Sequence, residues 1–340
     1  MPDLIVCCAE VANPNWRWIE GNFEGNDFSF QFVRCTPRNW LERNVKFINF
    51  ARLRGCLDAV LLAKRQNALV LVTHGPTLAA WCGLFAWFFG LKACLLAHSF
   101  NFTDLPGKLK IIIFKFGLRR TNRLVTFSRV ERSVYARAFD LPESRFEFVH
   151  WGANPPKIVG DNGFGEYVSS IGGNARDYRT LMDAARSVPH VPFVVIGRPE
   201  NFAGLDIPEN VISRTNTPLD YAMNVLNYSR FMVLPLTSSE VPCGHVTIVA
   251  AMHLGKAMIV TGSSGVDDYV IANENALVAP VQDPEALSVA IETLWNDEVL
   301  RNRLGKNGKQ FARSNCTEQK ITELFKAYLN EIVLGLHNAR

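Results

Sequence analysis

Short apolar runs alternate with helix-like patterns along almost the whole chain, and this alternation constrains the fold more than any other feature. Strands are predicted at residues 4–8, 28–35, 68–73, 93–97, 124–127, 146–150, 167–171, 192–196, 231–236, 257–261 and 276–279. Helices are predicted at residues 51–65, 76–89, 107–119, 129–139, 178–187, 218–227, 246–254 and 284–295, followed by a helical tail from about 297 to 335. This order is typical of an α/β protein with doubly wound parallel sheets. Phe28, Phe30 and Phe32 alternate with polar residues, so that strand is expected near a sheet edge.

A break at residues 151–156 separates two such series. The segment Trp151-Gly152-Ala153-Asn154-Pro155-Pro156 contains two prolines and a glycine, which prevent a helix or strand from continuing. We therefore predict one domain over residues 1–152, a second over 153–315, and a final helix at 316–340 that crosses back to the first domain. Two doubly wound domains joined by a short linker are expected to bind a ligand between the carboxyl ends of their sheets.

The composition excludes several classes of protein. The 340 residues include 36 Lys and Arg against 32 Asp and Glu, a balance too even for a protein that coats nucleic acid, although it allows an anionic ligand or an acidic membrane surface. The eight cysteines form no C-x-x-C pair and no Cys/His cluster at zinc spacing, so we expect buried thiols and no metal site. The first residues, MPDLIVCCAEVANPNW, lack the features of a signal peptide, which predicts a cytoplasmic protein.

Two segments raise the question of a membrane. Residues 79–97 are nearly long enough to span a bilayer, but Gly90-Leu91-Lys92 interrupts them, which favours a helix, a turn and a buried strand. Residues 107–123 interleave apolar residues with Lys108, Lys110, Lys115, Arg119, Arg120 and Arg123. This pattern suits a peripheral contact with an anionic membrane, and a core helix with a solvated basic edge explains it equally well. Arg119 and Arg120 also suit contact with a phosphate of an acceptor.

The densest chemical signal lies at residues 235–247. A predicted strand ends there in a loop of small hydroxyl residues and glycine, and a helix begins directly afterwards. The amides at a helix N-terminus bind anions, and Thr237, Ser238, Gly244 and Thr247 suit a phosphate at this point. The alternative is ordinary capping of the helix by a serine or threonine.

A series of motifs continues from this loop. It comprises Glu240, Gly244, Ala250-Ala251-Met252-His253-Leu254-Gly255-Lys256, the strand at 257–261, Gly265-Val266-Asp267-Asp268-Tyr269-Val270, Ile171-Gly172-Gly173-Asn174-Ala175-Arg176-Asp177-Tyr178, and the stretches 127–135 and 150–154. The series resembles retaining GT-B glycosyltransferases, in particular glycosyltransferase family 4, firmly over about 120–300 and faintly before residue 70. The resemblance implies a GT-B fold, in which two Rossmann-like domains face a central cleft. The first domain would bind the acceptor and the second the nucleotide sugar.

On the donor side, three residues are candidates for contact with the donor. Arg176, which follows Gly173, falls where the family's lysine grips the donor diphosphate, and a guanidinium can clamp that group with paired donors. Lys256 would be a second, weaker cation, and His245 would contact the donor. The structural alternatives are a surface salt bridge for Arg176 and a cation that suits the helix C-terminus for Lys256.

Two further residues would act at the sugar and the acceptor. Glu240 would hold the sugar hydroxyls or stabilise developing positive charge, unless it is an exposed loop carboxylate. His98 resembles the acceptor-side histidine of the family, and His74 ends the preceding strand at the same edge. A histidine at a strand end that only satisfies a nearby carbonyl is the alternative for both.

Two departures from the family pattern stand out. Its second glutamate, which typically holds the donor ribose, falls on Ala250, and Cys7-Cys8-Ala9-Glu10 stands where a glycine-rich loop is expected. The implied function is transfer of a hexose from a UDP- or GDP-linked sugar to a glycan or lipid-linked acceptor, with retention and without a metal or further cofactor. The rival interpretations are a nucleotide-sugar epimerase, a non-catalytic partner protein that kept the fold, and an inverting transferase with His98 or Asp104 as base.

Overall fold

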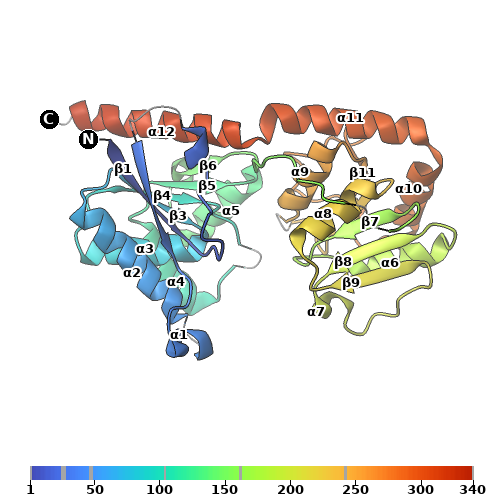
Figure 1. Ribbon diagram of the computed structural model, residues 1–340, viewed down its shortest axis with the longest axis horizontal. Coiled ribbons are helices and arrows are strands. Elements are labelled where there is room, and N and C mark those ends of the chain that lie inside the picture. Colours follow the sequence, from blue (N-terminus) through green and yellow to red (C-terminus); the bar gives the residue numbers. More distant parts are fainter. Residues whose placement is uncertain are drawn as a thin grey trace. The chain divides into compact units, whose positions relative to one another are not determined.

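The computed structural model describes residues 2–23, 28–45, 49–102, 105–160, 163–240 and 243–338. The chain divides into two compact units (Figure 1). Unit 1 comprises Met1–Val149 and Ile321–Arg340, and unit 2 comprises His150–Lys320. Each unit is an α/β domain built on one parallel sheet of six strands, as the alternating sequence pattern predicts.

Unit 1 has the strand order β2-β1-β3-β4-β5-β6. Its strands are β1 (Asp3–Ala9), β2 (Phe28–Arg34), β3 (Val70–His74), β4 (Cys94–His98), β5 (Arg123–Thr126) and β6 (Phe146–Phe148). Its helices are α1 (Trp40–Asn44), α2 (Phe50–Arg65), α3 (Pro76–Phe88), α4 (Lys108–Leu118) and α5 (Arg129–Phe139), with short 3-10 turns at Glu20–Asn22 and Glu143–Arg145. The strand β2 lies at the sheet edge, as its alternating phenylalanines predict.

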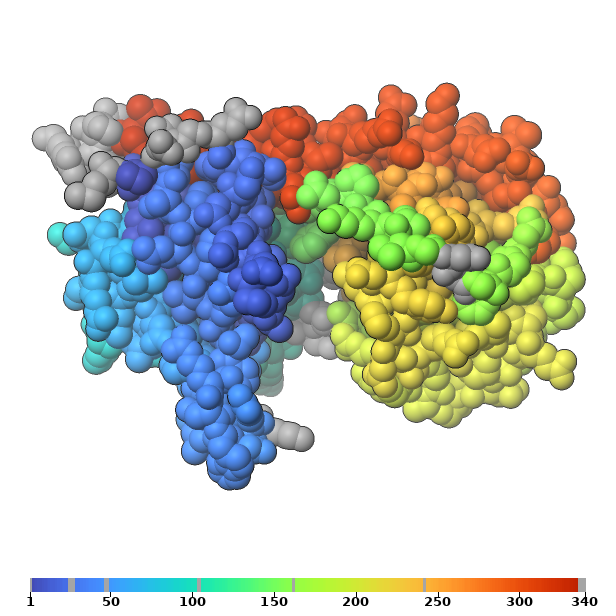
Figure 2. Space-filling model, viewed as in Figure 1, coloured from blue at the N-terminus to red at the C-terminus, as the bar shows by residue number. Residues whose placement is uncertain are grey.

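Helices cover both faces of this sheet, which explains why β1 is apolar from Leu4 onward. Alternate side chains of β1 point to opposite faces. Cys8 lies in the core beneath α2 and α3, whereas Cys7 lies in the core on the other face. The helix α12 (Glu318–Asn338) covers that second face with Phe325 and Leu329, one helical turn apart (Figure 1). By contrast, α1 projects from the rest of unit 1 (Figure 2), and its Trp40 is exposed.

Unit 2 has the strand order β12-β11-β10-β7-β8-β9. Its strands are β7 (Val168–Ile171), β8 (Phe193–Gly197), β9 (Val211–Thr215), β10 (Met232–Leu234), β11 (Met258–Thr261) and β12 (Leu277–Ala279). Its helices are α6 (Tyr178–Ser187), α7 (Pro199–Phe202), α8 (Leu219–Tyr228), α9 (His245–Leu254), α10 (Pro284–Asn296) and α11 (Glu298–Asn315). The chain runs outward from β7 through β8 and β9, then returns to place β10 on the other side of β7.

The structure differs from the sequence prediction in a few elements. The strand β9 has only Val211 buried, so the sequence gives no apolar run there. The predicted helical tail is two helices, because α11 ends at Asn315 and α12 begins at Glu318. The segment 79–97 is the end of α3 followed by β4, as predicted. Across the part of the chain that the structure describes, no helix has both the length and the apolar character needed to cross a bilayer.

Candidate functional site

Two loops of unit 2 meet at the carboxyl edge of its sheet. One follows β7 and the other follows β10, and an isolated bridge joins Arg176 to Leu236. The amide of Thr237 donates to the carbonyl of Ala175 (3.2 Å), which ties the loops together a second time. They lie where the strand order reverses between β7 and β10. Open α/β sheets bind ligands at such a reversal, outside the carboxyl ends of the strands.

Arg176 is the buried cation of this pair of loops, with 8% of its surface exposed. Its Nη1 donates to the Asn174 carbonyl at 2.7 Å, while Nε and Nη2 lie 3.4 and 3.5 Å from the Ile171 carbonyl. Among the described residues, no carboxylate forms an ion pair with the guanidinium. A Cβ on Gly172, whose φ is +126°, would lie 2.5 Å from Nη2, so only glycine leaves this space for the arginine.

The start of α9 is in direct contact with Arg176. Thr247 accepts a hydrogen bond from Nη2 of Arg176 at 3.4 Å, and no side chain caps the helix. Gly244 precedes the helix with φ +100°, and a Cβ there would lie 2.8 Å from Leu234. The positive end of a helix dipole and a guanidinium therefore lie side by side, which is an arrangement that binds an anion.

The remaining loop residues lie around this pair. Ser238 accepts a hydrogen bond from the Glu240 amide at 3.1 Å, and Glu240 is exposed. Gly173 packs against the side chain of Arg198, because a Cβ on Gly173 would lie 2.6 Å from it. Arg198 directly follows β8, and the sequence analysis missed it. The sequence shows only that an arginine follows a buried strand. The proximity of this arginine to Gly173 becomes evident only when β8 is seen to lie beside β7.

His245 begins α9 near Arg176, but its side chain bonds elsewhere, and the structure does not bring Lys256 to this anion site. The imidazole of His245 lies 2.8 Å from the carbonyl of Gly265 and packs on Tyr269, and burial lowers its pKa to about 4. Lys256 donates to the carbonyl of Ser229 at 2.8 Å and follows the C-terminal end of α9. Thr247 and Leu254, the last residue of α9, are seven residues apart, a rise of about 10 Å, and Lys256 lies beyond Leu254. Burial also lowers the pKa of Lys256.

Unit 1 carries a pair of histidines at the carboxyl ends of β3 and β4. His74 and His98 are register partners, and their rings lie 5.3 Å apart. Trp18 packs edge-on against both rings, at 4.8 and 5.0 Å, with its backbone at φ +47°. Nε2 of each histidine is buried without a hydrogen-bond partner among the described residues. Burial lowers the pKa of His98 to about 4, so its imidazole is neutral at pH 7. Asp104 lies outside the described residues.

The position of the expected ribose contact is apolar in the structure. Ala250 is buried in the middle of α9, within the core of unit 2. Ala250 has no carboxylate, so it cannot accept hydrogen bonds from the hydroxyls of a ribose as the family's second glutamate does.

The sequence of this chain is similar to those of known glycosyltransferases. Residues 175–311 match the family of glycosyl transferases group 1. An uncharacterised glycosyltransferase of Methanocaldococcus jannaschii is 23% identical over 288 residues, which cover 82% of this chain and 73% of that protein. The capsular polysaccharide biosynthesis glycosyltransferase CapM of Staphylococcus aureus is 23% identical over 69% of this chain and 59% of its own length.

Solved structures share the fold of the whole chain. The structure of Anabaena HepE in complex with UDP and glucose matches with a TM-score of 0.70, at 12% identity, over 97% of this chain and 100% of HepE. Arg176 and the start of α9 lie inside the matched segment, which begins one residue before Arg176. We conclude that this chain has the GT-B fold and that its residues 175–311 match the glycosyl transferases group 1 family.

Proposed function

We propose that this chain is a glycosyltransferase that moves a hexose from a UDP- or GDP-linked sugar to a glycan or a lipid-linked acceptor. The observation that carries the proposal is the contact between Arg176 and Thr247 at the start of α9, within the group 1 match. It lets a guanidinium and a helix dipole act on one diphosphate. The likeness to CapM favours a product in polysaccharide or glycolipid biosynthesis, and the likeness to HepE favours UDP as the nucleotide.

The proposed chemistry follows from where charge develops. The bond that breaks joins the anomeric carbon of the sugar to the diphosphate of the donor. Its cleavage leaves negative charge on the diphosphate and positive charge on the anomeric carbon. Arg176, with the hydroxyl of Thr247 and the amides that begin α9, would stabilise the diphosphate. These groups supply positive charge themselves, so we propose that transfer needs no metal ion and no cofactor besides the donor. Glu240, exposed on the neighbouring loop, would contact the sugar.

We assign the acceptor to unit 1 and retention of configuration to the reaction. His98 would contact a hydroxyl of the acceptor, because its neutral imidazole can donate or accept a hydrogen bond. In a retaining transfer the donor phosphate takes the acceptor proton on the same face of the sugar. An inverting transfer instead needs a base on the opposite face. Nuclear magnetic resonance of the new linkage separates the two, and an inverted anomeric configuration would refute retention.

We further propose that α3 and α4 rest on the cytoplasmic face of an anionic membrane, where a lipid-linked acceptor would lie. Leu109 and Ile112 are 75% and 65% exposed on α4, and Phe116 packs against the exposed Trp87 of α3 at 5.5 Å. Lys108 and its basic neighbours flank these residues on the same helix. Exposed apolar and aromatic side chains with flanking lysines are typical of helices that lie in a membrane interface.

Titration calorimetry with UDP, GDP and their sugars tests the proposed function. We expect one of the nucleotides to bind and its sugar to be hydrolysed slowly when no acceptor is present. The second candidate is a non-catalytic partner protein that keeps the fold, which the buried Ala250 favours because no carboxylate stands at the ribose position. Failure of every nucleoside diphosphate to bind would refute the transferase and support this partner protein.

A further inference from the structure

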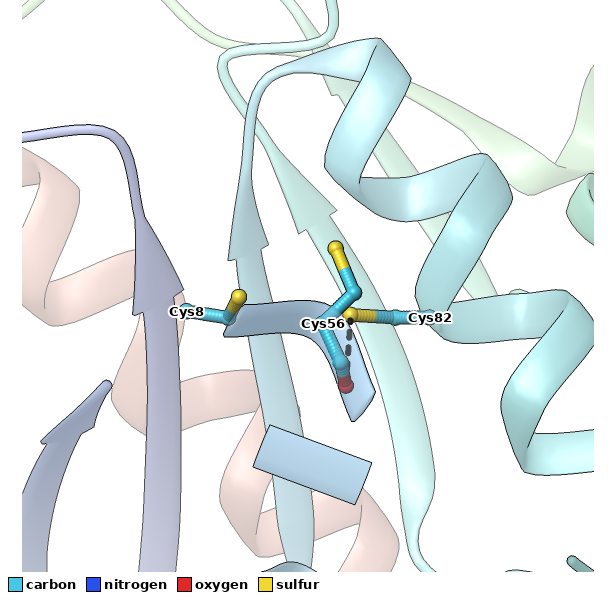
Figure 3. Close-up of side chains that lie close together, drawn as sticks. All are labelled: Cys8, Cys56 and Cys82. Carbon is cyan, nitrogen blue, oxygen red and sulfur yellow. Dashed lines mark hydrogen bonds between the residues drawn. The ribbon is translucent and has the colours of Figure 1, made fainter. Parts of the chain in front are cut away.

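Four cysteines from four different elements converge in the core of unit 1. They are Cys8 on β1, Cys35 directly after β2, Cys56 on α2 and Cys82 on α3. The sulfur atoms of Cys8, Cys56 and Cys82 all lie within 4.8 Å of one another. Figure 3 shows these three side chains side by side. The sulfur of Cys35 lies 3.6 Å from that of Cys8. The exposed fraction of each of the four residues is 5% or less, so the fold creates a buried cluster of thiols. No sequence motif predicts this cluster.

The packing of α2 makes room for the fourth sulfur. Gly55 lies in the interior of this 16-residue helix, and a Cβ there would lie 2.4 Å from Sγ of Cys35. Glycine is a poor residue for a helix interior, because it loses more backbone freedom on folding than any other. The helix therefore carries an unfavourable residue at the one point where Cys35 approaches it.

The thiols have only weak partners as they stand. Cys8, Cys56 and Cys82 each donate to a backbone carbonyl at 3.9 Å. One of these contacts, from Cys82 to the carbonyl of Cys56, is drawn in Figure 3. All four cysteines belong to one apolar core cluster of unit 1. Hydrogen bonding therefore does not explain why four sulfurs gather at one point.

The spacing of the sulfurs suits a single metal ion. Zinc bound by four thiolates at about 2.3 Å places the sulfurs about 3.8 Å apart in a tetrahedron. The distance of 3.6 Å between Cys8 and Cys35 is already close to this value. The sulfurs of Cys8, Cys56 and Cys82, within 4.8 Å of one another, need to move by about 1 Å or less, which side-chain rotation provides. Cys35 lies outside this group of three, so its side chain also has to turn toward Cys56 and Cys82.

We propose that Cys8, Cys35, Cys56 and Cys82 bind one thiophilic divalent cation as a closed structural site, for which Zn²⁺ is the probe. Thiolate ligands select zinc over the hard cations that prefer oxygen. One Zn²⁺ replaces the four thiol protons, which pass to solvent, and the ion with four thiolates carries a net charge of 2−. This site is in unit 1, outside the family match, and it takes no part in the proposed metal-independent transfer. The two proposals therefore stand or fall separately.

Metal content of the full chain tests the proposal. The protein is expressed with zinc in the medium, purified with a mild reductant and without chelator, and analysed by plasma mass spectrometry. We expect about one zinc ion per chain, as for other closed four-cysteine sites. Cys8→Ala and Cys82→Ala should each lower the content more than tenfold. The matched control is Cys7→Ala, because Cys7 is equally buried on the same strand but faces the opposite core, and it should keep its zinc.

Two further measurements decide the matter if the variants do not fold. Cobalt(II) added to the metal-stripped, reduced wild-type chain should give a thiolate-to-cobalt charge-transfer band, and zinc should abolish it. Denaturation with chelator but without reductant should then release all eight thiols. Wild-type protein without zinc and without the cobalt band would overturn the proposal. Only six free thiols would overturn it as well, because they would indicate a disulfide such as Cys8–Cys35 in place of the metal.

Discussion

Replacing Arg176 by alanine is expected to weaken nucleoside diphosphate binding far more than it weakens the fold. A hydrogen bond to a charged group contributes about 1.5–3 kcal/mol, so its loss raises the dissociation constant about 10- to 150-fold. The cost to the fold is smaller, because the guanidinium makes one short bond, to Asn174, and its bonds to Ile171 are 3.4 and 3.5 Å long. We expect the free energy of unfolding to fall by about 1 kcal/mol.

Titration calorimetry with UDP and GDP measures the binding, and urea unfolding measures the stability. Arg176→Lys should give an intermediate dissociation constant, since lysine keeps the charge but loses the paired donors of the guanidinium. The matched control is Arg186→Ala in the same unit, because Arg186 is half-exposed and pairs with Asp206 on the surface. It should bind the nucleotide within about twofold of the wild type. A folded Arg176→Ala variant with unchanged affinity would refute the role of Arg176 in holding the diphosphate.

Three other predictions follow from single residues. Ile112→Glu should reduce sedimentation of the protein with vesicles of phosphatidylglycerol. The control Val299→Glu, at a 79% exposed site on α11, should not reduce it. Equal binding by both variants would contradict the proposed membrane face. Burial lowers the pKa of His98 and of His245 from 6.5 to about 4. Below pH 6.5 the unfolded chain therefore binds more protons than the folded chain. The free energy of unfolding falls as the pH decreases from 6.5 toward 4. Between pH 6.5 and 5 the loss is about 2 kcal/mol per histidine, and urea titrations of His98→Gln should lack its share of that loss. Glu131 is a buried carboxylate that accepts hydrogen bonds from the backbone of the Ser128 turn, so Glu131→Ala should cost about 3 kcal/mol or more in urea unfolding, and a loss below about 1 kcal/mol would show that these bonds contribute little.

The sequence was sufficient to predict the strands whose apolar runs are buried on both faces, and with them the fold. It failed for β9 because burial there is confined to Val211. It also predicted that the loops carrying Arg176 and Thr237 contribute to one site, and the structure brings these loops together. It could not predict Arg198, because the relevance of that residue depends on β8 lying beside β7.

The helix α9 shows a second limit of sequence reasoning. Lys256 and Thr247 are nine positions apart in the sequence, which gives no reason to separate them. The helix α9 places them at opposite ends, and the lysine forms its hydrogen bond with Ser229. The cysteine cluster shows the opposite case, in which residues far apart in the sequence lie close together in space. Cys8 and Cys35 are 27 residues apart, a spacing that matches no metal motif, and only the fold of unit 1 makes them neighbours.

The burial of Arg176 provides a test of whether a ligand explains its presence. A cation that is 92% buried without a carboxylate partner among the described residues is costly, and its short bond to Asn174 and its long bonds to Ile171 and Thr247 offset only part of this cost. Arg176→Leu should therefore be at least as stable as the wild type when no nucleotide is present, as judged by urea unfolding. The nucleotide at a hundred times its dissociation constant should stabilise the wild type by about 2.7 kcal/mol, and the variant by much less at the same concentration. A purely structural arginine would give the opposite result: a destabilised leucine variant, and the same nucleotide effect on both proteins.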